Sequence, residues 1–232
     1  MTTKSADGII LPTPGEWDGR QLSASYVADY KPFNFVDGEG VRCSLYVSGC
    51  PFKCPGCYNE AAQSFRYGKS YNAELEEKIL ADLAQPYVAG LSLLGGEPML
   101  ATPILLPLVR RVRAEFGDTK DIWVWSGYTF ERLMIDTSDK HELLELCDVL
   151  VDGPFIKQLY HHDLAFRGSK NQRIIDLAAT RAKMAQLGLA PSAADSADDA
   201  ATAYHDAVVL WDSGRPDKED SVPFLKPAAP SS

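Results

Sequence analysis

Hydrophobic and polar residues follow two different spacings along this chain from about residue 30 onward. Short apolar runs that suit buried strands are separated by longer stretches whose apolar residues recur every three or four positions. Residues 73–84 have the helical spacing, with Leu75, Ile79 and Leu83 on one face and Asn72 as the predicted N-cap. We predict strands at 43–48, 90–94, 122–125 and 148–152, helices at 73–84, 102–116 and 139–146, and a weaker strand and helix at 173–176 and 177–187.

This order of elements predicts an α/β fold. A strand followed by a helix and another strand forms a right-handed unit with parallel strands, so repeated units build a parallel sheet or a partial barrel. Chemistry in such folds lies at the carboxyl ends of the strands. A polar or glycine-rich segment follows each of the four stronger strands, and we expect these segments to meet at one rim: 50–57, 95–98, 126–128 and 152–153.

Two flanking regions lack this pattern. Residues 1–25 contain scattered glycine and proline and are predicted to be an N-terminal extension laid over the domain or trailing from it. Residues 26–187 form the predicted domain. Residues 188–232 are predicted to be an acidic, low-complexity linker and a C-terminal tail, in which the apolar segment 207–211 could dock back on the domain.

Composition and charge narrow the class of protein. The chain has 232 residues, of which 45% are hydrophobic, and its formal net charge is −9. This length and composition suffice for a full core, and the acidic balance does not favour a nucleic-acid or membrane partner. The N-terminus has no signal-peptide pattern, and no apolar run reaches the length of a membrane span. We therefore expect a cytoplasmic protein with reduced cysteines.

Three of the five cysteines lie in one short segment. Cys50, Cys54 and Cys57 are spaced so that a single loop can turn all three thiolates toward one centre. Structural zinc and an ordinary four-cysteine iron–sulfur cluster would each require a fourth ligand, which no nearby residue supplies. Cys147 could provide it from a distance, but Cys147 and Cys43 are both predicted to be buried small hydrophobes of the strand region.

The cysteine loop resembles the C-x3-C-x2-C loop of the radical S-adenosylmethionine enzymes. In that superfamily three thiolates hold a four-iron cube, and the amino and carboxylate groups of S-adenosylmethionine chelate the open iron. The turn Gly95-Gly-Glu-Pro98, which follows the next strand, is similar to the superfamily's clamp for the methionine amino group. The resemblance implies a short partial (β/α) barrel of the radical S-adenosylmethionine type.

Further motifs between about residues 30 and 175 resemble the activating enzymes of the anaerobic (class III) ribonucleotide reductases. These motifs are Asp37-Gly-Glu-Gly-Val-Arg42, Val47-Ser-Gly-Cys50, Cys54-Pro-Gly-Cys57-Tyr58-Asn59, Asp121-Ile-Trp-Val-Trp-Ser-Gly-Tyr128, Val149-Leu-Val-Asp-Gly153 and Arg167-Gly-Ser-Lys-Asn-Gln172. The resemblance implies that Cys50, Cys54 and Cys57 bind a [4Fe-4S] cluster. The S-adenosylmethionine contacts chosen on this basis are Gly56, Cys57, Tyr58, Gly95, Gly96 and Glu97, with no catalytic side chain beyond these groups.

The activity implied by this resemblance is generation of a glycyl radical on a large reductase subunit, by reductive cleavage of S-adenosylmethionine with electrons from a donor such as flavodoxin or ferredoxin. The nearest alternatives are an activase of the pyruvate formate-lyase type and a radical enzyme acting on a metabolite. An electron-transfer iron–sulfur protein with Cys147 as fourth ligand and a zinc-stabilised adaptor are alternatives of other classes.

Several other residues have more than one interpretation. Trp123, Trp125 and Tyr128 alternate near a strand end, where core packing explains two of them at least as well as ligand stacking. His161 and His162 are expected to point apart as a surface pair. Arg167 could pair with a carboxylate or a partner, or form a surface salt bridge. Asp152 aligns only weakly with the Asp-x-Lys sequence of the pyruvate formate-lyase activases, because Pro154 stands where the lysine would be.

Overall fold

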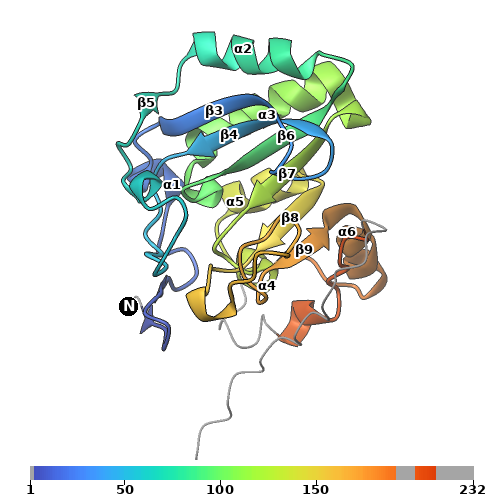
Figure 1. The fold of residues 1–232 in the computed structure, drawn as a ribbon. Helices are drawn as coiled ribbons and strands as arrows, with labels where there is room; N and C mark the ends of the chain where they lie inside the picture. Colours follow the sequence, from blue (N-terminus) through green and yellow to red (C-terminus); the bar gives the residue numbers. More distant parts are fainter. Residues whose placement is uncertain (1–2, 192–201, 213–232) are drawn as a thin grey trace, which may run out of the picture.

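The computed structural model describes residues 3–191 and 202–212 (Figure 1). The strands are β1 (Thr3–Lys4), β2 (Ile10–Leu11), β3 (Tyr26–Asn34), β4 (Val41–Val47), β5 (Lys69–Ser70), β6 (Val88–Gly95), β7 (Asp121–Trp125), β8 (Val149–Asp152) and β9 (Arg173–Asp176). The helices are α1 (Gly19–Leu22), α2 (Ala73–Leu83), α3 (Thr102–Phe116), α4 (Phe130–Leu133), α5 (Ser138–Glu145) and α6 (Leu177–Gln186), with short 3-10 turns between them. The strands and helices predicted from the sequence correspond to β4, β6, β7, β8 and β9 and to α2, α3, α5 and α6.

The main sheet is mixed and has seven strands in the order β5-β3-β4-β6-β7-β8-β9. Strands β4, β6, β7 and β8 are parallel neighbours, and β3 and β9 run antiparallel at either side of them. The predicted α/β class is therefore confirmed. The sheet is open, with β5 and β9 at its two ends.

The prediction that residues 173–176 continue the parallel βα series is wrong. Strand β9 pairs antiparallel with β8, with Leu150 opposite Ile175. The segment that joins β8 to β9 contains only the 3-10 turn Lys157–Leu159, and no α-helix carries the chain back to the other end of the sheet. The chain therefore re-enters the sheet in the opposite direction.

The two faces of the sheet have different packing partners. Alternate residues such as Leu45, Leu93 and Val124 lie in one large core with side chains of α2, α3 and α5, because successive strand residues point to opposite faces. On the other face Trp123, Val149 and Val151 form a second, smaller cluster. Beside this second cluster the Arg42 guanidinium is fully buried: it donates to Ser92, pairs with Asp121 and lies 5.3 Å from the Trp123 ring.

Both flanking regions contact the sheet domain where the structure describes them. Ile9 and Trp17 are buried members of the large core. Residues 207–211, the apolar segment that could dock on the domain, lie against β9 through an isolated bridge between Leu210 and Ile175. The central part of the predicted linker (192–201) and the end of the tail (213–232) lie outside the described residues. Within residues 3–191 and 202–212, no helix has both the length and the apolar character needed to cross a membrane.

Candidate metal centre

A cavity of about 560 Å³ lies at the carboxyl ends of the parallel strands. The four segments predicted to meet at one rim all contribute to it, through Cys50, Gly96, Ser126 and Gly153 among others. The connection between β8 and β9 adds a further wall that the sequence pattern did not predict: Pro154, Phe155, Tyr160, His161, His162, Leu164, Phe166, Arg167, Gly168 and Gln172.

The three loop cysteines line this cavity together. Each is partly exposed and none forms a disulfide, whereas Cys43 and Cys147 are fully buried and do not line the cavity. Burial raises the pKa of the Cys54 thiol to about 11, and burial together with the nearby Glu97 carboxyl raises the pKa of Cys50 well above its usual range. A metal group that binds these sulfurs must therefore displace protons. Three thiols that line one cavity fit a metal cluster that takes three protein ligands.

Two glycines allow the cysteine loop and the Gly95–Pro98 turn to approach closely. Gly96 N–H donates to Val47 O at 2.7 Å, and Glu97 N–H donates to Gly49 O at 2.8 Å. A Cβ on Gly96 would lie 2.7 Å from that same Gly49 oxygen. Gly49 has φ +102°, and a Cβ there would lie 2.1 Å from the Phe65 ring. Side chains at these two positions would force the cysteine loop away from the strand ends.

The Glu97 carboxylate is directed into the protein's own backbone. Met99 N–H and the Ser126 hydroxyl donate to Oε1 at 3.0 and 2.8 Å, and Gly127 N–H donates to Oε2 at 2.8 Å. The side chain is 1% exposed, and this burial raises the pKa of Glu97 to about 7. Glu97 thus joins the turn after β6 to the segment after β7 and holds two walls of the cavity in register.

The remaining predicted cofactor contacts are Gly56, Gly95 and Tyr58. Gly56, with φ +77°, shapes the cysteine loop beside Cys57, and Gly95 lines the cavity at the end of β6. Tyr58 is 71% exposed, and its ring centroid lies 5.7 Å from that of Phe155 and 6.1 Å from that of Tyr160. These three rings form an aromatic cluster at the cavity. Phe155 and Tyr160 were missed because the segment between β8 and β9 has no strand or helix spacing.

The three aromatic residues at and after β7, Trp123, Trp125 and Tyr128, are divided between the core and the cavity. Trp123 is fully buried in the second core cluster, and Tyr128 packs against Trp17 and Phe52 in the large core. Trp125 lines the cavity, and its indole N–H donates to Phe166 O at 2.8 Å. Core packing therefore accounts for two of the three.

Asp152 is buried and has a structural position. It pairs with Arg173, which also binds Glu131, and its carboxylate accepts from Phe130 N–H at 2.8 Å. Asp152 does not line the cavity. The residue instead ties the end of β8 to α4 and β9.

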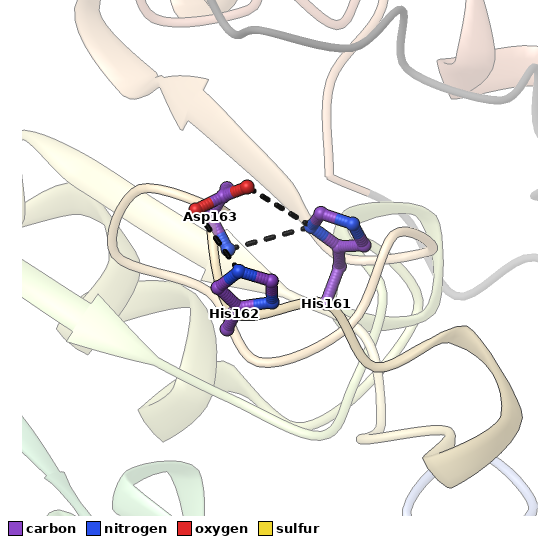
Figure 2. Close-up of side chains that lie close together, drawn as sticks. All are labelled: His161, His162 and Asp163. Atoms are coloured by element: carbon purple, nitrogen blue, oxygen red, sulfur yellow. Dashed lines mark hydrogen bonds and ion pairs between the residues drawn. The ribbon is translucent and has the colours of Figure 1, made fainter.

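His161 and His162 do not point apart, so that expectation is wrong. Their rings stack with centroids 5.0 Å apart and planes 19° from parallel, beside Asp163 (Figure 2). His162 Nε2 lies 3.4 Å from an Asp163 carboxylate oxygen, and Asp163 N–H donates to His161 Nδ1 at 3.4 Å. These local contacts turn both rings to the same side of the chain. One potential ligand atom from each of the three residues lies within 4.8 Å of the others.

Comparison with known proteins places this geometry in context. Residues 36–175 match the family described as "4Fe-4S single cluster domain". The chain is 46% identical over 149 residues to a Vibrio cholerae protein, covering 62% of this chain and 94% of that protein. It is 41% identical over 147 residues to an Escherichia coli K12 protein (62% and 93%) and 38% identical over 145 residues to a phage T4 protein (62% and 88%). All three relatives are named anaerobic ribonucleoside-triphosphate reductase-activating protein.

Proposed function

Because this chain belongs to the family of anaerobic ribonucleoside-triphosphate reductase-activating proteins, we propose that it activates such a reductase by generating a glycyl radical on it. The observation that carries this proposal is the meeting of Cys50, Cys54 and Cys57 with the Gly95–Pro98 turn in one cavity. The alternative in which Cys147 is a fourth ligand receives no support, since Cys147 is fully buried in the large core.

In this proposal Cys50, Cys54 and Cys57 hold a [4Fe-4S] cluster, and Gly56, Cys57, Tyr58, Gly95, Gly96 and Glu97 form the S-adenosylmethionine site. When bound, the two groups supply one-electron chemistry, namely cleavage of the sulfonium and removal of one hydrogen atom from a glycine Cα. The net change consumes one electron and yields methionine, 5′-deoxyadenosine and the glycyl radical. The electron comes from an external donor such as flavodoxin or ferredoxin.

The chain's own residues bind and orient these groups. The loop cysteines provide the thiolates, and the glycine contacts at Gly49 and Gly96 bring the cysteine loop to within backbone hydrogen-bonding distance of the turn after β6. Glu97 fixes that turn to Ser126 and Gly127 and thereby sets the width of the cavity between β6 and β7. Such preorganisation keeps competing reactions of a radical site low.

We further propose that the open sheet is the short, incomplete barrel of the radical S-adenosylmethionine type, left open so that a glycine-bearing segment of a large protein can enter. The supporting feature is the exposure of Tyr58 and Tyr160 at the cavity. Exposed aromatic side chains beside a reactive site are suited to protein contacts. The target is therefore expected to be a polypeptide.

The test uses the reconstituted protein under anaerobic conditions, mixed with S-adenosylmethionine, a reductant and the anaerobic reductase. Cys50→Ala, Cys54→Ala and Cys57→Ala should each abolish formation of 5′-deoxyadenosine and of the glycyl-radical doublet in electron paramagnetic resonance. Cys43→Ala and Cys147→Ala are the matched controls and should retain both, because neither thiol lines the cavity.

Deuterium placed on the target glycine Cα should appear in 5′-deoxyadenosine. Radical formation only on a pyruvate formate-lyase-type partner, or deuterium transfer only from a small metabolite, would contradict the assignment to the reductase. Loss of the cluster in Cys147→Ala would favour the electron-transfer alternative.

A further inference from the structure

The connection between β8 and β9 forms a loop at the wall of the cavity. Its base is closed by an isolated bridge between Tyr160 and Ser169, and its far part is fastened by the bond from the Trp125 indole to Phe166 O. Three residues whose side chains commonly bind metal ions follow the bridge directly: His161, His162 and Asp163. The loop therefore presents these three side chains from a backbone that is held at two places.

The Asp163 carboxylate faces one nitrogen atom of each imidazole ring (Figure 2). His162 Nε2 lies 3.4 Å from one carboxylate oxygen, and His161 Nδ1 lies 4.0 Å from the other. The two rings stack with their planes 19° from parallel. One ligand atom from each residue thus lies within 4.8 Å of the other two.

These separations are close to those of a metal site. In a tetrahedral zinc site with bonds of about 2.0–2.2 Å, neighbouring ligand atoms lie about 3.3–3.6 Å apart. The contact between His162 and Asp163 already has this spacing, and the 4.0 Å contact of His161 requires only a small closure. An ion at His161 Nδ1 would replace the hydrogen bond from Asp163 N–H, which at 3.4 Å is long.

The donor set selects the class of ion. Imidazole nitrogens suit divalent transition metals such as Zn²⁺, whereas Mg²⁺ and Ca²⁺ prefer sites made of oxygen atoms alone. The side chains of His162 and Asp163 are 73% and 55% exposed, so water can reach an ion bound to them and complete its coordination.

We propose that His161, His162 and Asp163 bind a divalent transition-metal ion of the zinc type. The site lies at the wall of the cavity, because both histidines line it. It is separate from the three loop cysteines, and it does not rest on the proposed function. In a preparation without an iron–sulfur cluster, the zinc that depends on His162 should still bind.

The experiment adds Zn²⁺ to the reconstituted protein under anaerobic conditions and records the zinc K-edge X-ray absorption spectrum. Zn–N bonds are about 2.0–2.1 Å long and Zn–S bonds about 2.3 Å, so the spectrum distinguishes the proposed site from the cysteine loop. We expect nitrogen and oxygen ligands, with outer-shell scattering from two imidazole rings. Competition with a chromophoric chelator measures the dissociation constant for Zn²⁺.

Two variants each remove one ligand from an exposed position. In His162→Ala and in Asp163→Asn the dissociation constant for Zn²⁺ should rise by at least about 10-fold, because even a residue that only orients a metal ligand contributes on that scale. His205→Ala is the matched control, since the His205 side chain is 52% exposed and lies outside the cluster; it should bind Zn²⁺ as the unmodified protein does. Circular dichroism and iron content confirm that each variant is folded and loaded.

Zinc bound through sulfur alone would overturn the proposal, and so would an affinity that neither His162→Ala nor Asp163→Asn changes. Both results would leave the proposed function intact, because the cysteine loop and the Gly95–Pro98 turn are unaltered in these variants.

Discussion

The two flanking segments of this protein support different parts of the sheet domain. Near the N-terminus, Ile10 N–H donates to Phe52 O at 2.9 Å, inside the cysteine loop, and the Trp17 ring packs edge-on to Phe52 at 5.0 Å. At the other end, residues 209–211 pair with β9, the last strand of the sheet. The family match covers residues 36–175. Both flanking segments lie outside it, including Ile10 and Trp17 on one side and residues 202–212 on the other.

Polar contacts also distinguish the N-terminal segment from the segment after residue 202. The buried Lys140 ammonium donates to Trp17 O at 2.7 Å and pairs with Asp136, and Arg132 donates to Pro12 O at 2.8 Å. The N-terminal segment is thus fastened to α4 and α5 as well as to the cysteine loop. The segment after residue 202 instead pairs with a strand that would otherwise leave its backbone edge open, a common protection of sheet edges. The comparison indicates that a segment outside the family match can still be part of the site's support.

The largest effect is expected from Trp17→Ala. Removing a buried tryptophan leaves a cavity between Phe52 and Tyr128, which costs about 3–5 kcal/mol in unfolding free energy. Because Phe52 lies between Cys50 and Cys54, cluster content should fall with stability. Urea denaturation and iron analysis after reconstitution measure the two effects.

Leu22→Ala is the matched control, since Leu22 belongs to the same segment but is 37% exposed. It should change stability by less than about 0.5 kcal/mol. A Trp17→Ala protein with full stability and full iron content would show that the N-terminal segment does not support the cysteine loop.

An intermediate effect is expected from Glu97, whose surroundings include the charge of Lys140. Burial raises the pKa of Glu97 to about 7 from an ordinary value of 4.5. Between these values the unfolded chain releases the proton while the folded chain keeps it, so this residue's contribution to stability falls as pH rises from about 4.5 to 7. The total change is at most about 3–4 kcal/mol, from roughly 1.4 kcal/mol for each unit of pKa difference.

Glu97→Gln should remove this pH dependence, because the amide does not titrate. It should also weaken the link to Gly127, since an NH2 group cannot accept from that N–H. Urea denaturation at several pH values between 4.5 and 7.5 measures the slope. Identical slopes for the unmodified protein and Glu97→Gln would contradict the raised pKa.

The predicted strands and helices match the structure where buried positions repeat with the regular apolar spacing of a strand or a helix. Helix α3 begins and ends at the predicted residues, because one face carries apolar side chains and Gly117 stops it. Strand β3 was not predicted, since Val27 is its one buried position and the other residues, polar and apolar in no regular alternation, are partly or fully exposed. The direction of β9 depends on a helix-free connection between β8 and β9, which short-range spacing did not reveal.

The residues of the candidate site also fall into two groups: those that local sequence spacing predicted and those that only tertiary packing brings together. Spacing alone grouped Cys50, Cys54 and Cys57, because neighbours in a loop remain neighbours in space. Trp17 reaches the site only through tertiary packing, and no local pattern connects it to Phe52. The stacking of His161 on His162 and the position of Arg167 depend on how the long connection between β8 and β9 folds back over the cavity.

The smallest effect is expected from Trp211→Ala at the other flank. The Trp211 ring lies 5.6 Å from Trp123 and packs against the second core cluster, but it is only partly buried, so its removal should cost about 1–2 kcal/mol, below the range for a fully buried tryptophan. The backbone bonds from Trp211 N–H to Ile174 O and from Asp176 N–H to Val209 O remain available to the variant, and none of these residues lines the cavity. Iron content and S-adenosylmethionine cleavage should therefore match those of the unmodified protein, with Trp211→Phe as the control that restores most of the lost stability. Loss of the cluster in Trp211→Ala at a temperature where the variant is folded would show that both flanks support the metal centre, and the distinction between them would fail.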